Sequence, residues 1–182
     1  RPGVSTGRIE IVEVDDRSVS EVGQWPWRRD IIGLLIDRIR EQGAAAIVFD
    51  LLFSEPDRFQ RFAEGRDDKR ADAVPDPDAA LGDSVVRGKV VMGYAMTFAK
   101  SVAESSAACT SHSLKLPVTQ PPGEGNELPL FRASGAICSL PQLEQQAEAS
   151  GFLNAVPDAD GIHRRVPLLM ERDGRFYPGL GL

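Results

Sequence analysis

The clearest hydrophobic pattern in the sequence predicts a helix from about Arg28 to Gln42. Its apolar residues recur with the 3.6-residue period of a helix, and charged residues occupy the opposite face. Gly43 follows at the position where a glycine commonly ends a helix. The helix therefore has one face suited to packing on a sheet. The apolar positions are Ile31, Ile32, Leu34, Leu35, Ile36 and Ile39.

Strand patterns stand on both sides of this helix. Residues 8–14 alternate apolar and charged side chains, which predicts a strand. Residues 44–49 are continuously apolar, which predicts a second strand that is buried on both faces. A strand, a helix and a second strand form a right-handed parallel unit. We therefore expect the two strands to be parallel neighbours, with residues 17–23 as a loop.

The remaining patterns predict a mixed sheet with further helices. The chain ends in two strand-like stretches joined by the turn Asp173-Gly174. We therefore predict an α/β fold: a single domain over residues 1–182, with a mixed sheet, a parallel βαβ start, flanking helices and a C-terminal antiparallel hairpin. The other expected elements are helices at 77–86, 141–149 and from Pro178, strands at 89–97, 151–154, 164–172 and from Arg175, and a turn at 158–161.

Two polar stretches interrupt these patterns. Residues 57–78 hold five basic and seven acidic side chains and few apolar ones, which predicts a solvated surface excursion. Residues 99–134 have no period and are rich in Ser, Ala, Pro and Gly, which predicts an irregular functional loop. The two tryptophans, Trp25 and Trp27, stand directly ahead of the predicted helix. We expect at least one of them to be buried against it.

Composition limits the classes of partner. The 182 residues are 42% hydrophobic and 26% charged, which excludes wholesale disorder. The formal net charge of −6 disfavours nucleic acid and anionic lipid as partners. No apolar run approaches the roughly 18–20 residues of a membrane helix. Because the chain begins without Met, we expect it to be a piece of a longer protein.

The two cysteines, Cys109 and Cys138, allow two interpretations. They are either unpaired small apolar residues or one disulfide that closes a loop of about thirty residues. A disulfide would require an oxidising compartment. No His or Cys pair has the spacing of a zinc site, and no nucleophile motif or phosphate-binding glycine loop is present. The sequence therefore predicts no catalytic residue and no cofactor.

Acidic residues follow several of the predicted strands and turns. The carboxyl ends of parallel strands meet at one edge of a sheet, where α/β proteins bind ligands. Carboxylates at such an edge either pair with arginines as a structural network or bind a divalent cation or an amine-bearing ligand. Both outcomes stay open, with Arg29 and Arg164 as the expected partners. The candidate ligand-binding residues are Asp15, Asp16, Arg29, Asp50, Glu55, Asp158 and Arg164.

Several motifs together resemble the second type of CHASE domain, the cyclase/histidine-kinase-associated sensory extracellular domain. The most specific combination is Trp25-Pro26-Trp27 with the sequence Phe-Asp-Leu-Leu-Phe-Ser-Glu-Pro at 49–56. The resemblance covers residues 8–57, 89–97 and 150–178, and departs at His163, where the family has an apolar residue. The C-terminal matches are Gly151-Phe152-Leu153-Asn154, Asp158-Ala159-Asp160-Gly161 and Arg164-Arg165-Val166-Pro167-Leu168.

The resemblance implies a bacterial membrane receptor, in which this domain is a sensor and not an enzyme. Domains of this family lie between membrane helices, on the periplasmic or extracellular face of the inner membrane. The cytoplasmic output is a nucleotide cyclase, a diguanylate cyclase, a Ser/Thr kinase or the histidine kinase of a two-component system. The implied partners are an unidentified small molecule or ion, the membrane helices of the same chain and a second copy of the receptor.

Two other functions stay open from the residues alone. A metal-dependent hydrolase would use Asp15, Asp50 and Asp158, bind a divalent metal and turn over phosphoesters. A purely structural dimerisation module would show no ligand-dependent shift in melting temperature.

Overall fold

The computed structural model of the protein describes residues 8–59, 76–98, 109, 112–114 and 130–182. Helices and strands are interspersed along this part of the chain. The helices are α1 (Asp16–Val22), α2 (Arg29–Glu41), α4 (Pro77–Val86) and α5 (Pro141–Gln146). The strands are β1 (Ile47–Phe49), β2 (Val90–Thr97), β3 (Phe131–Arg132), β4 (Gly135–Ile137), β5 (Ala149–Phe152), β6 (Leu169–Arg172) and β7 (Arg175–Pro178).

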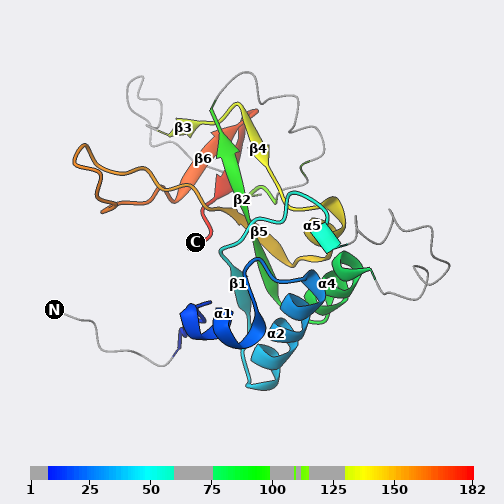
Figure 1. The fold of residues 1–182 in the computed structure, drawn as a ribbon. Coiled ribbons are helices and arrows are strands. Elements are labelled where there is room, and N and C mark those ends of the chain that lie inside the picture. The colour runs from blue at the N-terminus through cyan, green and yellow to red at the C-terminus, as the bar shows by residue number, and fades with distance from the viewer. Residues whose placement is uncertain (1–7, 60–75, 99–108, 110–111, 115–129) are drawn as a thin grey trace, which may run out of the picture.

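Strand β2 is central to the fold (Figure 1). β1 and β5 pair with it in parallel, and β4 pairs with its C-terminal part in the antiparallel direction. β6 and β7 form an antiparallel hairpin, and β3 pairs with β6 in parallel. The chain is therefore a single mixed α/β domain with a C-terminal hairpin, which confirms the predicted fold class.

The parallel part of the sheet uses different strands from those predicted. β2 pairs in parallel with both β1 and β5, and α4 lies between β1 and β2 in the chain. Residues 8–14 form no strand, and the side chains of Ile9 and Ile11 are 82% and 90% exposed. The alternating pattern meets no partner strand, and Asp15 behind it begins a helix instead. The predictions of a strand at 8–14 and a loop at 17–23 are therefore wrong.

Strand β1 is shorter and more exposed than its apolar sequence predicts. Phe49 lies in the core, whereas Val48 is 55% exposed because it points to the opposite face of the strand. The prediction that this strand is buried on both faces is therefore wrong.

The C-terminal segment confirms the hairpin but not its full predicted length. Asp173 and Gly174 have φ values of 52° and 71°, as a two-residue hairpin turn requires. β6 begins at Leu169 and not at Arg164. Pro167 has no backbone N–H for a strand ladder, which explains the later start. Pro178 belongs to β7, and residues 179–182 form a β-bridge with Phe152 and a turn, so no helix begins at residue 178 in the described residues.

Helices α2, α4 and α5 and strands β2 and β5 lie close to their predicted positions. Helices α2 and α4 pack against each other, and α5 packs against α4. The buried residues form two groups, one beside these helices and one around the hairpin. The first group includes Trp27, Ile32, Ile36, Phe53, Leu81, Val85, Met92 and Leu143, and the second includes Tyr94, Met96, Phe152, Met170 and Tyr177.

The two polar stretches differ from the prediction where the structure describes them. Asp57 and Asp78, the two ends of the predicted solvated excursion, are 3% and 1% exposed, so these ends are not solvated. Residues 60–75 between them lie outside the described residues. The second stretch contains the short strand β3, and most of its remaining length also lies outside the described residues.

Candidate functional site

The loop that follows β1 contributes both to a small pocket and to a buried ion-pair cluster at the start of α2. Phe53, in the middle of this loop, is 3% exposed. Its backbone N–H donates a hydrogen bond to the Ser139 hydroxyl at 3.1 Å, and its carbonyl accepts one from the N–H of Leu140 at 2.8 Å. The loop is therefore attached to the connection between β4 and α5.

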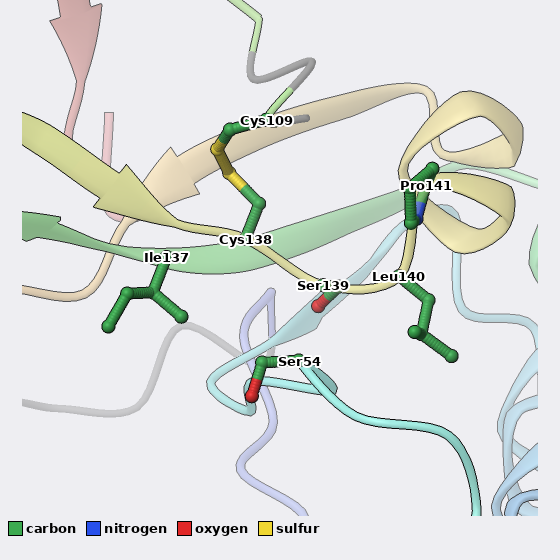
Figure 2. A pocket seen from close by; sticks show the side chains of 7 residues that line it. All are labelled: Ser54, Cys109, Ile137, Cys138, Ser139, Leu140 and Pro141. Atoms are coloured by element: carbon green, nitrogen blue, oxygen red, sulfur yellow. A yellow bond between two sulfur atoms is a disulfide. The ribbon is translucent and has the colours of Figure 1, made fainter. Parts of the chain in front are cut away.

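A small pocket lies beside this attachment (Figure 2). Its volume is about 150 Å³, which is below the roughly 300–1,000 Å³ of most drug-sized ligand sites. The hydroxyls of Ser54 and Ser139 provide polar groups, and Ile137 and Leu140 provide apolar ones. Polar and apolar side chains therefore both line the pocket, and its volume is smaller than that of a drug-sized ligand site. Its lining residues are Ser54, Cys109, Ile137, Cys138, Ser139, Leu140 and Pro141.

A disulfide between Cys109 and Cys138 forms part of this pocket, and the two Cα atoms are 5.5 Å apart. It holds the segment at 112–114 near the sheet, where the His112 N–H donates to the Ser150 hydroxyl at 2.9 Å. Of the two interpretations of the cysteines, the structure adopts the bonded one. The sequence left the pairing open, and it did not predict that the two cysteines line a pocket.

We expect the chain to contain no free thiol when it is purified from an oxidising compartment. Because the disulfide closes a loop of 29 residues, the chain-entropy model gives it about 3–4 kcal/mol of the free energy of unfolding. Thiol counting under denaturing conditions tests the pairing, and urea unfolding of Cys109→Ala/Cys138→Ala tests the energy. Two free thiols in the secreted protein would contradict the pairing.

Arg29 lies in a buried ion-pair cluster at the start of α2. Its backbone N–H donates to a carboxylate oxygen of Asp57 at 2.7 Å, so Asp57 satisfies a helix N–H that the N-cap residue Arg28 leaves unbonded. Its side-chain Nε lies 3.5 Å from Oδ1 of Asp78. Its guanidinium stacks 4.1 Å from the ring centre of Phe53. Hereafter we refer to Arg29, Phe53, Asp57 and Asp78 as the Arg29 cluster.

Burial and charge oppose each other within the Arg29 cluster. Burial raises the pKa of Asp78, while the Asp57 N–H, 2.9 Å from Oδ2 of Asp78, and the charge of Arg29 act against this rise. Burial likewise lowers the pKa of Arg29, against the charges of Asp78 and Asp57. Arg29 is therefore the one guanidinium beside two carboxylates in the cluster, and its Nε and Oδ1 of Asp78 form an ion pair without a hydrogen bond. Asp57 and Asp78 were missed by sequence reasoning because they lie in a highly charged stretch typical of a solvated surface.

The predicted residues at the start of the chain have a local role. Asp15 is the N-cap of α1, where it accepts hydrogen bonds from the N–H and hydroxyl of Ser18 at 2.8 and 2.6 Å. These bonds hold the pKa of Asp15 below its ordinary value. Asp16 is the exposed first residue of the same helix. Neither residue ends a strand, so the reason for expecting them at a sheet edge is wrong.

The other predicted residues lie in two further segments. Asp50 and Glu55 are exposed in the loop after β1. Asp158 and Arg164 pair with each other at 3.1 Å, and Arg164 also binds Asp160 at 2.8 Å. Hydrogen bonds from Arg165 and Arg164 lower the pKa of Asp158. Arg164 thus pairs with carboxylates of the adjacent turn at 158–161. This turn lies where the sequence predicts it.

The described residues contain neither a metal-ligand cluster nor a helix of membrane-spanning character. Within this part of the chain, no three or more His, Cys, Asp or Glu side chains lie together as ligands for a metal ion. None of its helices is both long enough and apolar enough to span a membrane.

The family model described as the CHASE2 domain matches residues 1–182. The chain therefore belongs to the CHASE2 family, whose members are extracellular sensory domains of signalling receptors. No curated protein and no solved structure matches the chain.

Proposed function

We propose that this domain senses a small ligand outside the cytoplasm of a bacterium and passes a conformational change through the membrane to a cyclase or kinase output. The match of the CHASE2 model to the whole chain carries the proposal, because it assigns every described element to a sensory domain. The parent receptor acts as a homodimer, and the membrane helices of the same chain receive the change.

The connections around Phe53 support a route for this change. A ligand in the pocket contacts Ser54, the neighbour of Phe53 in the chain. The backbone of Phe53 is hydrogen-bonded to Ser139 and Leu140, and its ring stacks on Arg29. Because Arg29 is the first residue of α2, a shift of the loop moves this helix. A ligand biases such a change only through its different affinities for the two conformations.

A thermal-shift screen tests the proposed ligand site. The probes are Ca²⁺, Mg²⁺, small cationic metabolites and small neutral molecules, each added to the wild type and to two variants. Ser54→Leu fills the pocket, and Asp50→Asn removes an exposed carboxylate of the same loop. We expect one class of probe to raise the melting temperature, by the linkage between binding and stability, and Ser54→Leu to abolish the shift.

The variants separate the pocket from the acidic residues. A shift that is lost in Asp50→Asn and kept in Ser54→Leu would place the ligand on the carboxylates predicted from the sequence. A control variant, Ser20→Leu on the exposed side of α1, should bind as the wild type does. If no probe shifts any of these proteins, the pocket is not a site for these classes of ligand.

A further inference from the structure

A buried carboxyl group on α5 has no partner for its charge. Glu144 is 1% exposed, and neither carboxylate oxygen makes a hydrogen bond of good geometry; the backbone N–H of Ser139 is the one donor that acts on its pKa. Its neighbour in the chain, Leu143, is fully buried in the core. A buried carboxylate is normally paired or hydrogen-bonded, because an isolated charge is costly away from water. This arrangement suits the neutral, protonated form of Glu144.

The groups around α5 do not compensate an ionised Glu144. Helix α4, which packs against α5, carries two acids: Asp83 is exposed, and Asp78 is engaged with Arg29. From β2, the buried hydroxyl of Tyr94 also makes no hydrogen bond, and burial raises the pKa of Tyr94, with a smaller contribution in the same direction from the charge of Glu144.

Two further groups that act on Tyr94 come from the C-terminal hairpin. Arg172 on β6 and Tyr177 on β7 act on the pKa of Tyr94. Nη2 of Arg172 donates to the Tyr177 hydroxyl at 3.2 Å and its Nε lies 3.7 Å from Asp173, while Nε and Nη1 make no hydrogen bond. Burial raises the pKa of Glu144 to about 7, and the backbone N–H of Ser139 offsets this only in part. Among the described residues, no cation acts on the pKa of Glu144.

We propose that Glu144 is a proton-binding site through which this sensory domain responds to the pH outside the cytoplasm. The inference rests on the proposed sensory function and names its stimulus. When the carboxyl group is protonated, α5 packs with Glu144 buried. When it ionises, the charge requires water, and α5 shifts or opens to admit it.

The hydrogen bonds at the start of α5 connect this change to the rest of the domain. Ser139 and Leu140, which directly precede α5, hold the backbone of Phe53. Phe53 in turn stacks on Arg29 of α2. A movement of α5 therefore reaches α2 through the same loop that lines the pocket, and the two tryptophans ahead of α2 report it.

The proposal fixes the direction of the pH dependence. Glu144 has an ordinary pKa of 4.5 in the unfolded chain and about 7 in the folded one, so it favours folding below about pH 4.5. This contribution to the free energy of unfolding is lost as the pH rises from about 4.5 to about 7. Above about pH 7 Glu144 adds no further pH dependence to the stability. One pKa unit is a factor of ten, so the folding equilibrium constant changes by about 300-fold over this interval.

The experiment compares the unfolding of the 182-residue wild type and Glu144→Gln between pH 4 and pH 8. Glutamine keeps the shape without the charge, so we expect the variant to lose the 300-fold change and to be more stable than the wild type at pH 8. The control is Glu148→Gln, which removes an exposed carboxyl group just beyond α5 and should keep the wild-type pH profile. Tryptophan fluorescence should change with a midpoint near pH 7 in the wild type and the control, but not in Glu144→Gln.

A direct titration keeps the proposal falsifiable even if Glu144→Gln does not fold. The carboxyl carbon of Glu144 in the wild type, followed by NMR, should titrate above pH 6. A midpoint near 4.5, or identical pH profiles of Glu144→Gln and Glu148→Gln, would overturn the proton site. Either result would leave the sensory function standing, because that function is tested by the output of the parent receptor and not by this titration.

Discussion

Replacing Trp27 by alanine should lower the free energy of unfolding by about 3–5 kcal/mol, as truncation of a packed aromatic typically does. The indole is 9% exposed and lies in the core with Ile32 and Ile36 of α2. Its Nε1–H donates to the carbonyl of Gly23 at 2.7 Å, so the side chain also fixes the turn between α1 and α2. The sequence-based prediction that at least one tryptophan is buried is thereby confirmed.

Two further variants separate packing from the hydrogen bond. Trp25→Ala is the matched control, because Trp25 is only partly buried at the edge of the same core and should lose less stability. Trp27→Phe keeps an aromatic ring without the donor, and should lose less than Trp27→Ala. Urea unfolding measures all three. If Trp25→Ala and Trp27→Ala both melt within a degree or two of the wild type, the indoles are exposed and a binding role explains them better.

Replacing Asp78 by alanine should have a comparable effect, about 3–5 kcal/mol, because it leaves a buried charge without its partner. The side chain of Arg29 is 14% exposed and that of Asp78 is 1% exposed, so water screens the remaining charge poorly. The variant also removes the acceptor of the Asp57 N–H. Asp83→Ala, on the exposed side of the same helix, is the control and should change stability by less than about 0.5 kcal/mol.

A double variant tests whether the loss comes from the unpaired charge. Arg29→Met/Asp78→Leu replaces both partners by apolar side chains, which a buried site often tolerates better than the loss of one partner. We expect it to be more stable than Asp78→Ala. Equal losses in Asp78→Ala and Asp83→Ala would mean that the Arg29 cluster does not contribute to folding.

Elements with strong local patterns could be predicted from the sequence. Helix α2 has a continuous apolar face, and α4 begins with Asp76 as N-cap and a proline in its first turn. Residues 8–14 have an equally clear alternating pattern but form no strand. A strand needs hydrogen bonds from a neighbour, and a pattern within one segment cannot supply them. The Asp15 and Ser18 spacing was an available signal for the helix that begins there.

The candidate site was harder to predict because burial of charge depends on distant parts of the chain. Asp57 caps a helix that begins 28 residues earlier, and Glu144 is buried although its short helix has no distinctive pattern. Arg29 was predicted correctly as a partner for carboxylates, but the carboxylates it binds were not among the candidates. The pocket brings together segments more than 80 residues apart, Ser54 and Ser139 among them. The motif around Ser54 and the two cysteines were the sequence features that lie there, but nothing in the sequence joined them.

The most direct test of the sensory role is the cytoplasmic output of the parent receptor, measured in spheroplasts while a stimulus is applied to the outer face. The stimulus is one that changes the purified domain, either a ligand from the thermal-shift screen or a change of pH across 7. We predict that output changes with the stimulus, and that a receptor lacking this domain but keeping its membrane helices has a constant output. A response that persists without the domain, or an intact receptor that responds to no stimulus that alters the domain, would contradict the account.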